Sequence, residues 1–221
     1  MSEWWTYTLS DFLLFSARTY YRLIELYNRD VWPAHAIALA GGLGVLGILR
    51  RRPAWGSRAI AATLAASWLF VAWAFHFDRY AAINWAASFF AVAFLIESLL
   101  LVWVGVVAGQ LAFSAGGTLA SRAACGLFVL ALLGYPLIAP LAGRPWTQSE
   151  VFGVAADPTV MATVGLLPLA PARSHWLLLP IPLLWCAVSG ATLWALQSPE
   201  WMVLPGAAAV ALLLVRRAKV R

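Results

Sequence analysis

Apolar segments long enough to cross a lipid bilayer dominate this sequence and constrain its fold more than any motif does. A transmembrane helix needs about 20 mostly apolar residues, or fewer where aromatic or basic side chains anchor its ends. Seven segments meet or approach this length, at about residues 31–49, 59–77, 82–107, 123–143, 157–172, 176–196 and 201–215. Because the connections between them are short, we expect an all-α, integral membrane helical bundle of about seven transmembrane helices.

Composition supports this fold class and excludes several others. Hydrophobic residues make up 63% of the 221 residues and charged residues only 11%, whereas a soluble domain carries about 25% charged residues. The shortage of charge excludes a cytosolic globular enzyme, a nucleic-acid-binding module and a disordered tail. Two cysteines, Cys125 and Cys186, are too few for a disulfide framework or a thiolate metal site.

The distribution of charge predicts an orientation. With the amino terminus outside, the inner connections hold ten basic residues and no acid, and the outer segments hold five basic residues and eight acids. Lys and Arg near helix ends are retained in the cytoplasm. We therefore expect a multi-pass membrane protein with an outer amino terminus and a basic cytoplasmic tail at 216–221. The net charge of +6 is then a topology signal rather than a sign of a nucleic-acid partner.

The fifth segment is the weakest of the seven. Counted from Thr159 to Leu169 it is too short to cross, and Pro168 and Pro171 interrupt it. A re-entrant loop would place the basic carboxyl-terminal tail outside, against the charge pattern. Starting the span at Val151 restores its length but buries Asp157 part-way into the bilayer, so we keep seven spans.

Two local signals concern helix ends and kinks. Asp157-Pro158-Thr159 resembles a helix start in which Asp caps free N–H groups and Pro occupies the first turn. This loop either closes the outer face or belongs to a broken segment whose helix amino terminus faces an anion. Tyr135-Pro136 predicts a kink in the fourth span.

The first 30 residues are predicted to form an outer interfacial amphipathic helix. Thr8 followed by Asp11 resembles a helix start, and apolar and charged residues then form opposite stripes over 9–28. Too charged to span, this helix would lie in the outer interface with its apolar face toward the membrane. The alternative is a helix packed across the end of the bundle.

Glu97 is the clearest candidate for function inside the membrane. It lies near the middle of the third span, where an ionisable group is costly and is therefore a functional candidate. We predict an intramembrane relay for protons or cations. The alternative is a protonated carboxyl hydrogen-bonded to a neighbouring helix.

A second set of candidates is expected to form an outer polar cluster. Its members are His35, His76, Asp78, Asn84 and Asp157. Two histidines with carboxylates at similar depth are able to bind Zn²⁺ or another divalent ion or to carry protons, and His35, His76 and Asp157 would be the ligands. No HExxH motif and no closely spaced pair of histidines is present, so the alternative, a side chain at a helix end, is favoured for each histidine taken singly.

Several short motifs occur in an order that resembles a known family. They are Tyr27-Asn28, Trp32-Pro33, His76, Ile83-Asn84, Tyr135-Pro136, Phe152-Gly153-Val154, Asp157-Pro158-Thr159 and Pro182-Leu183-Leu184-Trp185. From about Phe12 to Val215 the chain resembles the bacterial domain of unknown function 6064 family. The resemblance implies a small polytopic protein of the bacterial inner membrane without an established activity. In that family a cysteine often replaces Asp157 and an amide often replaces His35, which weakens an essential metal role for either residue.

The leading functional hypothesis is permease-like transport of a small solute or ion. One alternative is a non-catalytic accessory or structural subunit of a larger membrane complex. A second is a metal-dependent membrane hydrolase, although a third histidine ligand is missing. The sequence thus favours a protein that is not an enzyme, whose partners are the lipid bilayer and a membrane protein or a second copy of itself.

Overall fold

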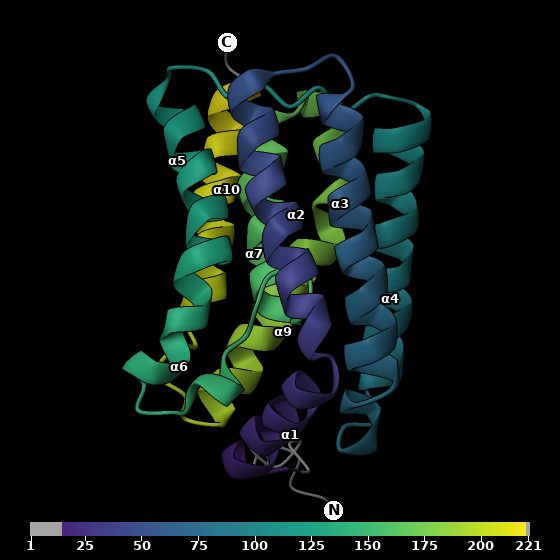
Figure 1. The fold of residues 1–221 in the computed structure, drawn as a ribbon. Coiled ribbons are helices and arrows are strands. Elements are labelled where there is room, and N and C mark those ends of the chain that lie inside the picture. The colour runs from purple at the N-terminus through teal and green to yellow at the C-terminus, as the bar shows by residue number, and fades with distance from the viewer. Residues whose placement is uncertain (1–14, 220–221) are drawn as a thin grey trace, which may run out of the picture.

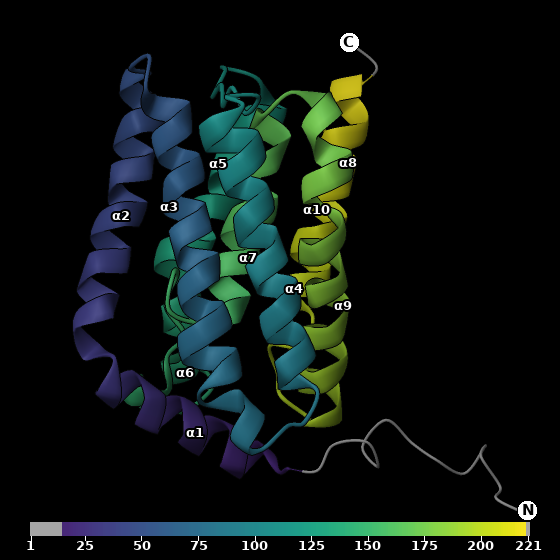
Figure 2. The ribbon, with the colours of Figure 1, turned by 90° about the vertical axis from the view of Figure 1, so that its right-hand side faces the viewer.

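The computed structural model describes residues 15–219, and in this part of the chain every regular element is a helix. Figure 1 labels the helices except α8, which Figure 2 labels. Their bounds are α1 Ala17–Asp30, α2 Trp32–Arg51, α3 Gly56–Phe70, α4 Ala87–Leu100, α5 Leu119–Val129, α6 Ile138–Leu141, α7 Ala156–Leu166, α8 His175–Leu178, α9 Pro180–Ala195 and α10 Val203–Lys219. The predicted all-α fold class is confirmed.

Five continuous helical segments are long and apolar enough to cross a membrane. They are Trp32–Arg51, Gly56–Ala82, Ala87–Val107, Leu119–Leu141 and His175–Ala195. Each begins and ends within five residues of a span predicted from the sequence. The other two predicted spans do not reach this length within the described residues, because one is the short helix Ala156–Leu169 and the other is α10, with 17 residues.

The long helices run roughly along one axis, and α1 lies across one end of the molecule (Figures 1 and 2). Helix α7 occupies the centre, where it contacts α3, α5, α9 and α10. Three long helices contain wider π-helical turns, at Val71–Phe77, Leu101–Val107 and Leu130–Gly134. The last of these leads into the 3-10 turn Tyr135–Leu137. The helical hydrogen-bond pattern therefore changes at the position where a kink is predicted, because Pro136 removes a backbone donor from the helix.

Helix α1 packs onto the bundle through its apolar stripe. Tyr20, Ile24 and Tyr27 are buried, and the Tyr27 hydroxyl donates to the carbonyl oxygen of Val154 at 2.8 Å. This is the alternative arrangement considered above, a helix packed across the end, rather than a helix with its apolar face free for lipid. The helix begins after Ser16, whose side chain accepts from the Thr19 N–H at 3.2 Å. The predicted start at Thr8 and residues 220–221 of the predicted tail lie outside the described residues.

The chain segment that leads into α7 is buried as completely as α7 itself. Every residue from Ser149 to Leu167 is buried, although the helix begins only at Ala156. The preceding residues are not helical, so their backbone groups need other partners. Thr159 supplies two of these contacts, because its hydroxyl accepts from the Gly153 N–H at 2.8 Å and donates to the Ala155 carbonyl at 2.7 Å.

Gly153 allows this segment to turn inside the bundle. Its φ of 77° lies in the left-handed region, which side chains with a Cβ rarely adopt. A Cβ at this position would lie 2.9 Å from the Cβ of Ala38 and 3.1 Å from the Oγ of Ser67. Both the backbone conformation and the close approach of α2 and α3 therefore require glycine.

We expect Gly153→Ala to destabilise the protein more than Gly143→Ala. Gly143 has a similar φ of 75°, but a Cβ added there would meet nothing within 4 Å, so the control carries the backbone penalty without the clash. Overpacking a close contact costs about 1–3 kcal/mol. Thermal unfolding in detergent micelles, followed by tryptophan fluorescence, measures the difference. Equal melting temperatures for the two variants would show that α2 and α3 do not pack closely against this turn.

Candidate functional site

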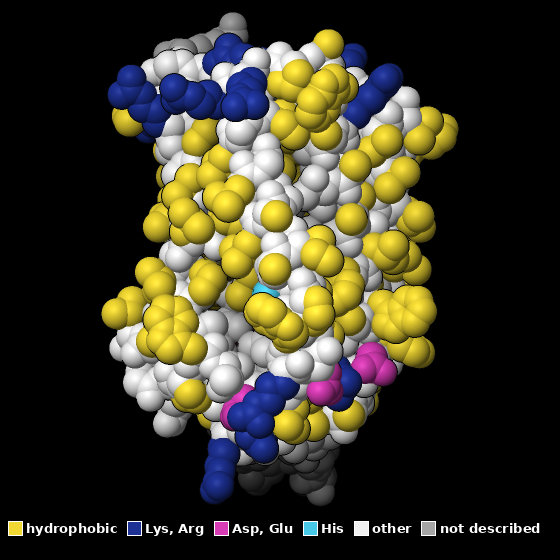
Figure 3. Space-filling model, viewed as in Figure 1, with side chains coloured by type: hydrophobic (Ala, Val, Ile, Leu, Met, Phe, Trp, Pro, Cys, Tyr) yellow, Lys and Arg dark blue, Asp and Glu magenta, His cyan; other side chains and the backbone are white. Residues whose placement is uncertain are grey.

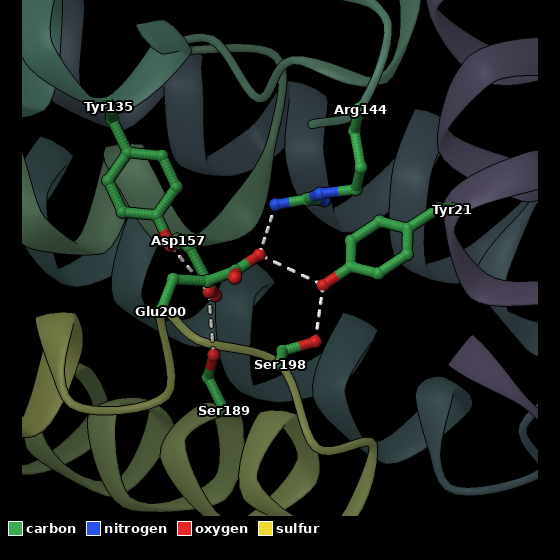
Figure 4. A network of polar contacts seen from close by, with 7 residues as sticks. All are labelled: Tyr21, Tyr135, Arg144, Asp157, Ser189, Ser198 and Glu200. Atoms are coloured by element: carbon green, nitrogen blue, oxygen red, sulfur yellow. Dashed lines mark hydrogen bonds and ion pairs between the residues drawn. The ribbon is translucent and has the colours of Figure 1, made fainter. Parts of the chain in front are cut away.

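Asp157 is the centre of a buried hydrogen-bond network. It is 2% exposed and accepts hydrogen bonds from the Trp185 indole N–H at 2.8 Å, the Tyr135 hydroxyl at 2.9 Å and the Ser189 hydroxyl at 2.6 Å. Figure 4 shows Tyr135 and Ser189 pointing toward this carboxylate. Trp185 and Ser189 are four residues apart on α9, so they share one face of that helix.

The predicted capping role of Asp157 is wrong. The residue before the first turn of α7 is Ala155, which makes no side-chain capping bond, and Asp157 lies within that turn. Its carboxylate is directed to α9 and to the helix that carries Tyr135, because three donors there satisfy it better than one backbone N–H. A negative charge in the first turn is also favoured by the helix dipole.

A second network lies beside the first and joins α1 to the loop before α10. The Tyr21 hydroxyl donates to Glu200 at 2.9 Å and lies 2.5 Å from the Ser198 hydroxyl. Arg144 forms an ion pair with Glu200, and its guanidinium carbon lies 3.8 Å from the centroid of the Tyr21 ring. Figure 4 shows Arg144 and Tyr21 approaching Glu200 from two sides. The Arg144 and Glu200 side chains are only 15% and 4% exposed.

Glu150 adds a third carboxyl group to this region. It is 8% exposed, and burial raises the pKa of its carboxyl well above the usual value. The negative charges of Asp157 and Glu200 raise this pKa further, whereas the positive charge of Arg144 opposes the shift. Three buried carboxyl groups thus influence one another around a single guanidinium group.

His76 lies in a box of aromatic rings. It is fully buried, and neither ring nitrogen has a hydrogen-bond partner among residues 15–219. The centroids of Phe94 and Trp185 lie 4.4 and 4.9 Å from that of the imidazole, and Phe75, Phe90 and Tyr80 complete the box. Because Trp185 also donates to Asp157, one indole ring links the histidine to the carboxylate network.

Glu97 is buried as deeply as His76. Its exposed fraction is zero, and neither carboxylate oxygen is hydrogen-bonded in the described part of the chain. The hydrogen bond to a neighbouring helix, considered above as the alternative to a relay, is made instead by the adjacent Ser98, whose hydroxyl donates to the Ala65 carbonyl at 2.8 Å.

The remaining members of the predicted outer cluster have separate local partners. The His35 ring nitrogens lie 3.1 Å from the Trp32 carbonyl and 3.2 Å from the Asn28 side-chain oxygen. Asp78 is exposed and pairs with Arg79 at 2.8 Å, and the Asn84 side chain accepts from the Ala86 N–H at 3.0 Å. The structure therefore brings His76 and Asp157 together through Trp185 and leaves the other three at helix ends. No group of three His, Cys, Asp or Glu side chains able to hold a metal ion occurs among the described residues.

The network also contains residues that sequence reasoning missed. They are Tyr21, Tyr135, Arg144, Trp185, Ser189, Ser198 and Glu200. The one available signal was the spacing of Trp185 and Ser189, which places an indole N–H and a hydroxyl on the same face of an apolar helix. The partners of Asp157 lie 22 to 32 residues away in the chain. Local sequence patterns therefore could not predict that these side chains contact Asp157.

These features define an all-helical protein with apolar helices of membrane-spanning length and ionisable groups buried among them. The chain belongs to the family of unknown function DUF6064, whose model matches residues 17–221. This match confirms the resemblance that the motifs indicated. No curated protein and no solved structure matches the chain.

We expect Glu150 to make stability depend on pH. Its folded-state pKa is raised, so its contribution to stability is fully present below the unfolded value of about 4.3 and is lost as pH rises through the folded value. The melting temperature of the wild-type protein should therefore fall relative to that of Glu150→Gln as pH rises from acid toward neutral. Differential scanning fluorimetry of both proteins over this range measures the difference.

Glu25→Gln provides a control in which the effect of pH on stability should have the opposite sign. Hydrogen bonding from Arg22 lowers the pKa of Glu25, so this carboxylate stabilises the fold above its unfolded pKa and loses that effect in acid. The two variants should diverge from the wild type in opposite pH directions. A pH-independent difference between the wild type and Glu150→Gln would contradict the proposed burial of an ionising Glu150.

Proposed function

We propose that this chain is a seven-pass protein of the bacterial inner membrane that moves a small cation or protons in a permease-like manner. The observation that carries the proposal is the interrupted, fully buried segment from Ser149 to Leu167, which holds Asp157 next to Glu150 and Glu200. In membrane transporters, discontinuous helices of this kind form substrate and ion sites near the bilayer midplane.

The surface supports a membrane location. Apolar side chains cover much of the surface between the two ends of the molecule (Figure 3). Among the exposed large apolar residues, Trp73, Phe89 and Leu99 are 72%, 67% and 59% exposed. Lys and Arg side chains gather at the end where the chain terminates, and both signs of charge occur at the opposite end. A belt of apolar side chains between two polar ends matches the layers of a bilayer.

The two shorter helices also fit as crossings in this proposal. Helices α7 and α10 run alongside the long helices (Figures 1 and 2). For α7, the buried segment before Ala156 supplies the missing length. Because this segment is enclosed by protein, its non-helical backbone is compatible with membrane depth. The basic end is then cytoplasmic by the positive-inside rule, and α1 lies on the outer side.

Cysteine accessibility tests the orientation and both shorter crossings. In a cysteine-free background, Thr147→Cys and Gln197→Cys should react with a membrane-impermeant maleimide in intact spheroplasts, whereas Arg173→Cys and Arg217→Cys should react only after permeabilisation. Thr147 and Gln197 precede α7 and α10, Arg173 follows α7, and Arg217 lies in the last turn of α10. All four residues are exposed. Labelling of both flanks of either helix from the same side would show that this helix does not cross.

The charge of the buried site favours a cation or a proton over an anion. Glu150, Asp157 and Glu200 face one positive group, Arg144. The amino terminus of α7, which would otherwise attract an anion, already has the Asp157 carboxylate in its first turn. Added positive charge would therefore be stabilised here, and an added anion would be repelled.

His76 adjoins this site through Trp185, and Glu97 is a further ionisable group buried in the bundle. Both are fully buried and lack hydrogen-bond partners among residues 15–219. A bare charge in an apolar interior is costly. The Glu97 carboxyl is therefore more stable with a proton or a bound cation than as an isolated carboxylate, whereas the His76 imidazole is more stable in its neutral form. His76 lies within a π-helical turn, a distortion that is frequent at functional sites. We assign Glu97 the role of relay.

Proton flux into proteoliposomes tests this function. With a pH-sensitive dye inside and a potassium diffusion potential as the driving force, wild-type vesicles should acidify faster than protein-free vesicles. Glu97→Gln should slow the flux about tenfold or more, because loss of a positioned proton-transfer group typically costs at least that much. The substitution breaks no hydrogen bond seen within the described residues, so folding should be retained.

Asp78→Asn is the matched control, because it removes an exposed carboxylate whose partner, Arg79, also pairs with Asp30. Its flux should equal that of the wild type. If wild-type vesicles show no proton, sodium or potassium flux above protein-free vesicles, translocation of cations is rejected. A stable complex with another membrane protein would then favour the accessory-subunit hypothesis.

A further inference from the structure

A pocket of about 740 Å³ opens at the basic end of the molecule, away from the carboxylate network. It lies between the beginning of α5, the 3-10 turn Leu167–Leu169 and the end of α10. Figure 1 shows α5 beginning beside the end of α10. The proposed translocation function uses none of the residues that line this pocket.

One wall is the amino terminus of α5. The first N–H groups of a helix lack acceptors within the helix and carry a partial positive charge. Thr118 satisfies one of them, because its side chain accepts from the Ser121 N–H at 3.1 Å. Leu119 and Ala120, which follow Thr118, also line the pocket. Such a terminus is suited to an anion.

Ser121 provides an independent sign of a ligand. The residue is 8% exposed and lines the pocket, yet its hydroxyl has no hydrogen-bond partner in the described part of the chain. Buried hydroxyl groups are normally paired, because leaving one unpaired loses the hydrogen bonds that it makes in water. A ligand oxygen in the pocket would complete this bond.

Two arginines supply the charge. Arg216 and Arg217, near the carboxyl end of α10, line the pocket, and no Asp or Glu is among its lining residues. A guanidinium group offers a planar set of donors that matches two oxygens of a phosphate. Donors from α5 and α10 thus converge on one space whose lining includes no carboxylate side chain.

The other wall is apolar. Pro168, Leu169 and Leu214 line it, so the pocket combines donors for an anion with a surface for hydrocarbon. A phosphate group with an attached acyl chain fits both walls, whereas a free phosphate would use only the donors.

We propose that this pocket binds a phosphate group, and that an anionic phospholipid of the cytoplasmic leaflet supplies it. Basic pockets between helices on the cytoplasmic side bind anionic headgroups in this way. The identity of the lipid source rests on the proposed membrane orientation, whereas the affinity for phosphate rests only on the lining residues.

Calorimetric titration of the purified full-length protein in uncharged detergent tests the site. The probes are dioctanoyl phosphatidylglycerol, dioctanoyl phosphatidylcholine and inorganic phosphate. We expect saturable binding of phosphatidylglycerol and weak or no binding of phosphatidylcholine. Arg216→Gln combined with Arg217→Gln should weaken binding about tenfold or more, and Ser121→Ala should weaken it to a smaller extent.

Arg50→Gln combined with Arg51→Gln is the matched control. These two exposed arginines end α2 and are absent from the pocket lining, so the variant removes the same charge without touching the site and should bind like the wild type. Tight binding of inorganic phosphate that competes with the lipid would support the anion site but assign it to a free phosphate rather than a lipid.

Two results would overturn the proposal. One is the absence of saturable binding of any anionic probe by the folded wild-type protein. The other is an equal loss of binding in both arginine pairs, which would indicate attraction by surface charge alone. Neither result depends on the flux measurement. A negative binding result therefore contradicts the phosphate site alone, and a negative flux result contradicts the translocation proposal alone.

Discussion

The burial of an interrupted chain segment is the constraint on which the rest of the structure depends. Between Ser149 and Leu167 every residue is enclosed, but only the part from Ala156 onward satisfies its own backbone as a helix. The remaining polar groups must be matched by side chains from elsewhere. Gly153 and Thr159 close the turn locally, and Tyr135, Trp185 and Ser189 converge on Asp157. The positions of α9 and of the helix carrying Tyr135 are thereby tied to α7.

The two kinds of buried polar group in this molecule have different consequences. Asp157 and Glu200 are held by several donors, so they contribute to the order of the end where α1 crosses the bundle. His76 and Glu97 have no such donors within residues 15–219, and no network explains why polar groups are retained there. That contrast is why the proposed relay is assigned to Glu97 and not to the well-satisfied Asp157.

Charge is arranged differently at the two ends, and this asymmetry links both proposals. The end that carries Glu150, Asp157 and Glu200 contains negative groups under the cover of α1, whereas the opposite end presents Arg216 and Arg217 beside the amino terminus of α5. In the proposed orientation the buried acidic site lies nearer the outer side and the phosphate pocket lies at the cytoplasmic leaflet. The same distribution of Lys and Arg that predicts the topology therefore also creates the pocket.

The sequence by itself determined the elements of this protein but not their meeting points. Apolar length predicted seven spans, five of which are helices of membrane-spanning length. Pro136 marked the position near Tyr135 where the helical pattern changes, and the prolines of the fifth segment marked it as unusual, because each effect acts within a few residues of the chain. The family was also recognisable, since its motifs are ordered along the chain. Only the tertiary structure decided that Asp157 is a network centre rather than a cap, that His76 lies in an aromatic box, and that α1 packs on protein. Those outcomes depend on hydrogen-bond donors and aromatic rings from helices that are distant in sequence. A buried polar group pairs with whichever partner lies nearest in space, and that partner is often far away along the chain.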